Sequence, residues 1–277
     1  MKNITIKRER KCRICKSSSQ VQNIFDLKST PIADYYSIIK LDNLKEYELS
    51  LKFCKNCNYT FLSKTLKADV SYKNYLYHTS TTTGLGNHYD EYINIITKKF
   101  KILPKSLALD IGSNDGSMLL SMKKNGLTPL GIEPAKKISD FANSKKLKTI
   151  NTYFNDQIAK KILKKYGKPK IITANYMFAN VDDISLFIKN IFNIIDEQGV
   201  FVIQTGYHPV QFSTMMFDYI YHEHYSYFSL SSLIKLLKKN NLKLIDASIN
   251  NHKLGSLRAI FSPEKSKFNV NKEQIKK

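Results

Sequence analysis

The segment 221–230, YHEHYSYFSL, holds two histidines, one glutamate and three tyrosines within ten residues. Such side chains can form a metal site, can place a general base beside its partners, or can belong to a buried strand. On a strand, His222 and His224 would share a face and could bind a metal. A third ligand is then needed, and Glu223 would point to the other face. A metal site is therefore the least favoured of the three interpretations.

A catalytic base is the second interpretation of this segment. Histidine is the default base because its pKa lies near neutrality, and a neighbouring carboxylate can orient its imidazole. A tyrosine hydroxyl can stabilise an oxyanion. The third interpretation is a half-buried strand or loop, because aromatic and polar residues alternate. The residues alone leave the choice between these two open.

The four cysteines of the chain, Cys12, Cys15, Cys54 and Cys57, form two C-x-x-C pairs. A tetrahedral zinc ion takes four such ligands, and each pair supplies two of them from one tight turn. Asn58 follows the second pair, at a position that often requires a left-handed backbone. Two redox dithiols or four core cysteines are the rival interpretations. The pattern favours Zn²⁺, in a structural role because four thiolates leave no open coordination position.

A third group of candidate residues surrounds a glycine-rich turn, 112–116, which follows the apolar segment 107–111 and precedes a helical pattern. Glycines in such a turn let backbone amides approach a ligand at the N-terminus of a helix. Glu133 lies 23 positions after Asp110, the usual spacing for an acid that accepts both ribose hydroxyls. A glycine turn that holds no ligand is the plainer alternative. The candidate cofactor-binding residues are Asp110, Gly112, Asn114, Gly116, Glu133 and Asn175.

The turn has the pattern D-x-G-x-x-x-G, not G-x-G-x-x-G, which disfavours a dinucleotide. With the acidic end of the next strand, it resembles the first two motifs of class I S-adenosylmethionine-dependent methyltransferases. Later segments fit the same fold. We expect a strand leading into a loop over 170–183, a helix over 183–195, a strand over 197–206, and a closing antiparallel pair over 244–249 and 254–262.

These elements predict an α/β protein with a small zinc-binding module, and the resemblance implies that its larger part is a Rossmann-like class I methyltransferase domain. The expected parts are a zinc-binding module over 1–65, a helical connector over 66–100, the methyltransferase domain over 101–262 and a frayed polar tail over 263–277.

Composition narrows the classes of partner. The chain of 277 residues carries a formal charge of +21, but only four of its 44 basic residues are arginines. Readers of nucleic acid usually depend on arginine forks, so the charge favours anionic ligands in general and argues against nucleic acid. The sequence has neither an apolar run long enough to span a membrane nor a secretory signal, so we expect a cytoplasmic protein.

The cysteine pairs, the glycine turn, YHEHYSYFSL and a GSLR string near the end together resemble the sugar C-methyltransferases of deoxysugar biosynthesis. The resemblance extends to about residue 261. It implies a zinc module, S-adenosylmethionine as cofactor, and methylation of a ring carbon beside a keto group on a nucleotide-linked or phosphorylated sugar. It also implies that Tyr221, Glu223 and His224 surround the reacting carbon, with His224 as the base.

The resemblance further implicates Tyr75 or Tyr77 in substrate binding, and His222 is a third candidate for that role. The chain departs from the family pattern in three places. The family continues into a second domain after the point where this sequence stops, a family histidine is replaced by Asn180, and a glycine pair is reduced to Leu254-Gly255. These departures leave open carbon or oxygen methylation and the sugar. An RNA methyltransferase and an inactive scaffold are the alternatives from other classes. The oligomeric state also stays open.

Overall fold

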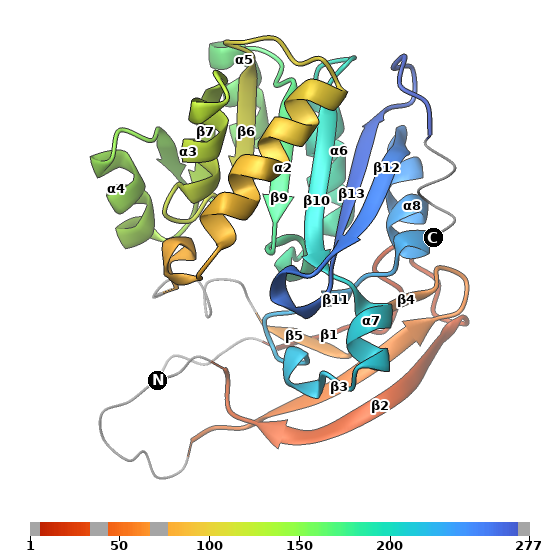
Figure 1. Cartoon of the computed structure of the whole chain (residues 1–277). Coiled ribbons are helices and arrows are strands. Elements are labelled where there is room, and N and C mark those ends of the chain that lie inside the picture. Colours follow the sequence, from red (N-terminus) through yellow and green to blue (C-terminus); the bar gives the residue numbers. More distant parts are fainter. Residues whose placement is uncertain (1–5, 34–43, 67–76, 271–277) are drawn as a thin grey trace.

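A computed structural model describes residues 6–33, 44–66 and 77–270, and its centre is a seven-stranded sheet in the order β12-β13-β10-β9-β6-β7-β8 (Figure 1). Strand β13 runs antiparallel to both neighbours, and the strands from β10 to β8 run parallel to one another. The α/β fold and the closing antiparallel pair are therefore confirmed. The strands are β6 (Leu107–Ile111), β7 (Thr128–Glu133), β8 (Thr149–Asn151), β9 (Ile171–Asn175), β10 (Val200–Gly206), β12 (Leu242–Asn250) and β13 (Ser256–Pro263).

Helices cover both faces of this sheet. Successive strand residues point to opposite faces, so Ile171 and Val202 join the core under α2 and α3, whereas Ile172 and Ile203 join the core under α5, α6 and α8. The helices are α2 (Leu85–Lys99), α3 (Ser117–Lys124), α4 (Lys136–Ser144), α5 (Asp156–Tyr166), α6 (Ile184–Ile194), α7 (His208–Ser213) and α8 (Leu230–Lys238), with short 3₁₀ turns η1 (Thr79–Thr81), η2 (Phe178–Asn180), η3 (Phe217–Tyr219) and η4 (His252–Leu254). No helix in the described ranges is long and apolar enough to cross a membrane.

The N-terminal strands form two smaller sheets at one end of the large one (Figure 1). Strand β1 (Ile6–Arg8) pairs with β5 (Lys64–Leu66), and the other sheet has the order β11-β4-β3-β2. The edge strand β11 comes from the segment 221–230, which lies far along the chain from the other three strands. The N-terminal sheet is thus completed by a strand that the sequence analysis places in the methyltransferase domain. Its strands are β2 (Val21–Thr30), β3 (Tyr47–Cys54), β4 (Tyr59–Leu62) and β11 (Ser226–Tyr227).

Two segments are more closely packed than the sequence suggests. Within the expected connector, 66–100, helix α2 buries Tyr92 and Ile93 against the sheet and α3, because its apolar residues recur at helical spacing. Within the expected tail, 263–277, Phe268 packs edge-on against Phe100, so this part of the segment contacts the domain.

Buried Arg13 joins the N-terminal strands to the large domain. Its guanidinium donates to Ser226 Oγ at 2.6 Å, to the Val181 carbonyl at 2.6 Å and to the Asp182 carbonyl. Tyr59 donates to the same Ser226 Oγ at 2.6 Å. A residue between two of the cysteines therefore holds both β11 and the loop that follows η2.

Candidate active site

A cavity of about 320 Å³ opens at the carboxyl ends of β6, β7 and β9. Crevices outside the carboxyl ends of parallel strands are the usual ligand sites of α/β sheets. Gly116 is the one candidate cofactor residue that does not line it. The predicted residues that do are Asp110, Gly112, Asn114, Glu133, Asn175 and Tyr77.

The glycine turn has a different role from the expected one. The amides of Gly112 and Ser113 donate to the Ile132 carbonyl at 2.8 and 3.0 Å, so they bind the neighbouring strand and do not face a ligand. Gly112 has a φ of +75°, and a Cβ there would lie 2.7 Å from Met177 Cγ. Glycine is therefore required for the left-handed turn and for close packing against Met177.

Asn114 binds the segment 77–79, which lines the cavity. Its side-chain amide donates to the Tyr77 carbonyl at 2.9 Å, and its Oδ1 accepts from the Thr79 amide at 2.9 Å. Asp115 accepts from the Ser80 amide in the same way, at 2.8 Å. The segment that carries Tyr77 is thereby held over the glycine turn. Tyr75 lies outside the described residues.

Two buried carboxylates, Asp110 and Glu133, line the cavity. Burial and the charge of Glu133 raise the pKa of Asp110 to about 7, against hydrogen bonds from Thr173 and Asn175. Burial also raises the pKa of Glu133, although the amides of Asn114 and Ala135 donate to it. Because burial disfavours negative charge, both acids are well placed to bind a cation or hydroxyl groups.

The buried polar atoms of the cavity fit a nucleoside cofactor. Ser113 Oγ and Asn175 Oδ1 lie buried at the cavity without a hydrogen-bond partner among the described residues. Such atoms are normally satisfied, so they indicate a polar ligand. Glu133 keeps lone pairs for ribose hydroxyls after accepting two amides.

Tyr221 and His224 form a hydrogen-bonded pair outside the cavity lining. His224 Nδ1 lies 3.0 Å from the Tyr219 carbonyl, and Nε2 lies 2.9 Å from the Tyr221 hydroxyl. A carbonyl only accepts, so Nδ1 carries the proton and Nε2 accepts from Tyr221. Burial, and then the charge of Lys253, lower the pKa of His224 to about 4, opposed by the Tyr219 hydrogen bond. His224 is therefore neutral at physiological pH. Its pKa is lower than the near-neutral value that the sequence suggests.

His222 and Glu223 lie outside the cavity lining as well. His222 is buried and lies 3.2 Å from the Tyr47 carbonyl of the N-terminal sheet, so it does not share a face with His224. Glu223 is buried as well, and neither residue lines the cavity. The turn at 221–224 separates the two histidines, whereas a strand would have aligned them.

A buried network beside the cavity was missed by the sequence analysis. Arg258 donates to Gln204 Oε1 at 3.0 Å and to His88 Nε2 at 3.1 Å, and Gln204 Nε2 lies 2.9 Å from the Tyr176 hydroxyl. A guanidinium cannot accept, so His88 is neutral with its proton on Nδ1. The available signal was a lone glutamine in the apolar strand VFVIQTG.

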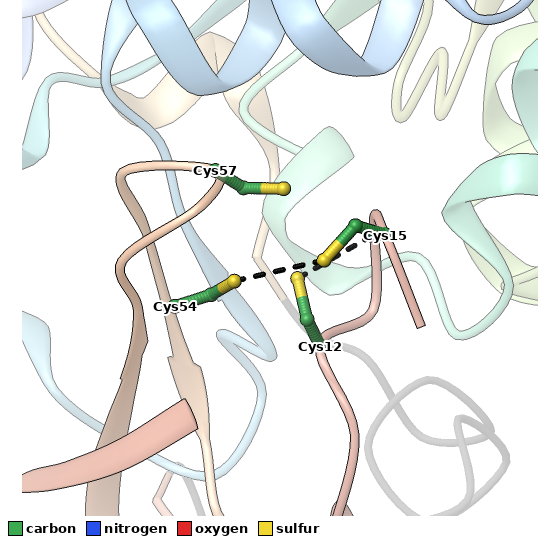
Figure 2. Close-up of side chains that lie close together, drawn as sticks. All are labelled: Cys12, Cys15, Cys54 and Cys57. Carbon is green, nitrogen blue, oxygen red and sulfur yellow. Dashed lines mark hydrogen bonds between the residues drawn. The ribbon is translucent and has the colours of Figure 1, made fainter. Parts of the chain in front are cut away.

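The four cysteine side chains converge from the turn at 12–15 and from the end of β3 with the turn that follows it (Figure 2). Their sulfur atoms all lie within 4.8 Å of one another, and Cys15 Sγ is 3.7 Å from Cys54 Sγ. A tetrahedral zinc with Zn–S bonds of about 2.3 Å separates its sulfurs by about 3.8 Å. Asn58 has the expected left-handed conformation, with a φ of 48°. Lys16, in the equivalent position after the first pair, has a φ of 63°.

Comparison with known proteins assigns the chain to a family. A family model described as a methyltransferase domain matches residues 89–247, more than half of the chain. This chain belongs to that methyltransferase family. With its fold and cofactor cavity, it is an S-adenosylmethionine-dependent methyltransferase.

Individual relatives are more distant. The C-methyltransferase NovU of Streptomyces niveus is 24% identical over 254 residues, which cover 91% of this chain and 60% of NovU. The methyltransferase chain therefore spans about 60% of the length of that curated relative.

Two solved structures share the fold. The plantazolicin methyltransferase BpumL, in complex with a pentazolic desmethylPZN analogue and S-adenosylhomocysteine, superposes with a TM-score of 0.51 at 14% identity, covering 64% of this chain and 83% of that one. A S-adenosylmethionine-dependent methyltransferase from Clostridium acetobutylicum ATCC 824 has a TM-score of 0.50 at 12% identity, covering 64% and 91%.

The pKa of Asp110 predicts how cofactor affinity depends on pH. S-adenosylmethionine carries a net positive charge, so it favours the ionised carboxylate and lowers the pKa of Asp110 when bound. Affinity should therefore rise as the pH increases from 6 to 8 through the value of about 7 in the free protein, by at most about tenfold per pH unit. The stability of the fold depends on pH in the opposite direction. The pKa of Asp110 is higher in the folded than in the unfolded protein, so its contribution to stability is fully present below the unfolded pKa and is lost as the pH rises through about 7.

Calorimetric titration with S-adenosylmethionine measures this dependence. Asp110→Asn should remove most of the pH dependence, and Asp90→Asn, which changes a surface carboxylate paired with Lys124, should keep it. A wild-type affinity that stayed constant from pH 6 to 8 would contradict the role of Asp110.

Proposed function

We propose that this methyltransferase acts on a nucleotide-linked or phosphorylated sugar and methylates a carbon beside a keto group. The observation that carries the proposal is the buried pair in which neutral His224 offers Nε2 as an acceptor to Tyr221. The similarity over 91% of the chain to a protein named as a C-methyltransferase also supports it, as does the resemblance of the string 221–230 to the sugar enzymes.

The chemistry of the proposal requires removal of a proton. When bound, S-adenosylmethionine supplies a methyl group on a sulfonium. A sugar carbon becomes a nucleophile only when it loses a proton beside a carbonyl, and the electron pair is then shared with the carbonyl oxygen. His224 takes that proton on Nε2, either directly or through the Tyr221 hydroxyl, and the Tyr219 carbonyl stabilises the imidazolium through Nδ1.

The cavity residues hold the cofactor in this scheme. Glu133 accepts the ribose hydroxyls, and Asp110 lies where it can balance positive charge. Tyr77 covers the cavity from the segment held by Asn114. Glu223, buried two residues from Tyr221, completes the proposed substrate side.

The base is tested by replacing His224. His224→Asn keeps a donor for the Tyr219 carbonyl but has no basic nitrogen, so turnover should fall by roughly 10²–10⁴. Affinity for S-adenosylhomocysteine should stay nearly unchanged, because His224 does not line the cavity. His222→Ala, in which the lost side chain contacts the Tyr47 carbonyl, is the control and should retain most of the turnover. Wild-type turnover in His224→Asn would make the pair structural.

Exchange in heavy water separates carbon from oxygen methylation. If a keto sugar is the substrate, the wild-type protein should introduce deuterium beside the ketone even without the methyl donor, and His224→Asn should not. Complete methylation of a hydroxyl without any exchange would instead favour an O-methyltransferase that uses the same base.

We also propose that Cys12, Cys15, Cys54 and Cys57 hold a structural Zn²⁺. The support is the sulfur geometry and the amides of Ile14 and Cys15, which lie 3.4 and 3.5 Å from Cys12 Sγ and would stabilise a thiolate.

The zinc proposal predicts about one zinc per chain by elemental analysis. Cys54→Ser should lower the zinc content and the melting temperature, because the N-terminal strands would lose their cross-link. Asn58→Gly is the control: it keeps every ligand and the left-handed turn, and it should keep the zinc. Freshly purified protein without zinc would rule the site out.

A further inference from the structure

Lys253 is an unusual member of the cavity lining. In the described part of the chain it is the one lysine, arginine or histidine among the lining residues, which also include four acids. These acids are Asp110, Glu133, Asp182 and Asp183. The cavity therefore has several groups for positive charge and a single group for negative charge.

The ammonium of Lys253 lies over two aromatic rings. Nζ is 4.3 Å from the centroid of Tyr176 and 5.2 Å from that of Tyr77. Among the described residues, no carboxylate lies within ion-pair distance of it. The side chain of Lys253 is exposed, and its packing against these rings still lowers its pKa. A cation that lines a cavity without a counter-ion is available to an anionic ligand.

The backbone holds this cation in place. Lys253 has a φ of 49°, a left-handed conformation that is unfavourable for a lysine. The turn is tied by Ser256, whose hydroxyl donates to the His252 carbonyl at 2.7 Å, and by the His252 ring, 3.8 Å from that of His88. The turn therefore fixes the position of Lys253 in the cavity lining.

We propose that Lys253 binds an oxyanion of the bound ligands. Two sources carry this chemistry: the carboxylate of the cofactor, which is the only anion on a molecule with a sulfonium and an ammonium, and a phosphate of the acceptor. The second source rests on the proposed sugar substrate. In either case the anion neutralises the charge that acts on His224 and makes that base stronger once the ligands are in place.

Calorimetry with paired ligands tests the cofactor as the source. S-adenosylhomocysteine carries the carboxylate, and 5′-methylthioadenosine lacks the whole amino-acid tail. Lys253→Met keeps the side-chain length and should weaken S-adenosylhomocysteine roughly tenfold to a hundredfold, while 5′-methylthioadenosine is unchanged. Lys253→Arg should restore most of the affinity. The control, Lys145→Met, removes the same charge from a lysine 4.1 Å from the ring of Phe141 on the surface, and it should change neither ligand.

The second arm tests the acceptor as the source. If Lys253→Met leaves S-adenosylhomocysteine affinity unchanged, inorganic pyrophosphate should bind to the wild-type protein saturated with S-adenosylhomocysteine and should lose that binding in Lys253→Met. Equal weakening of both nucleosides, or no change in any ligand, overturns the proposal. A wild-type protein that bound no S-adenosylhomocysteine would contradict the methyltransferase assignment itself, so the two failures are distinguishable.

Discussion

The hydrogen bonds of the buried Arg13 guanidinium join the two parts of the molecule, and the arrangement of these parts depends on them. It lies between the two cysteines of the first pair and donates to β11 and to the carbonyls of Val181 and Asp182. Asp182 lines the cofactor cavity. A buried charge is stable only when its hydrogen bonds are satisfied, so the N-terminal strands and the cavity wall must fold together.

The core has the same continuity. Cys12, Cys54 and Phe61 pack in one cluster with Phe187 and Leu233 from helices on the large sheet. The segment 221–230 crosses this boundary, because its later half pairs with β4 and its first half carries the Tyr221–His224 pair. We infer that the N-terminal strands, with their four cysteines, position the segment that carries the Tyr221–His224 pair.

Local patterns allowed much of this to be predicted from the sequence. The C-x-x-C spacing, the turn from Asp110 to Gly116 and the apolar strands all act over a few residues, and the structure contains them. Contacts between distant residues could not be predicted this way. Nothing near Gln204 indicates that His88 and Arg258 will meet it, and the low pKa of His224 arises from burial and from Lys253, which a sequence does not display. The turn at 221–224, which places His222 beside Tyr47, could not be predicted either, because the alternating aromatic residues of the segment suggest a strand.

The central claim is that the N-terminal strands, with their four cysteines, hold the cavity wall formed by residues within 178–187. Hydrogen exchange at these residues tests this claim most directly. In Arg13→Met the carbonyls of Val181 and Asp182 lose their donor, so amides over 178–187 should exchange at least about tenfold faster than in the wild type, with little change in β6 and β7. Arg10→Met, at an exposed position in the same segment, should leave that protection unchanged. Wild-type protection of 178–187 in Arg13→Met would contradict the account, because the wall would then be held by the large domain alone.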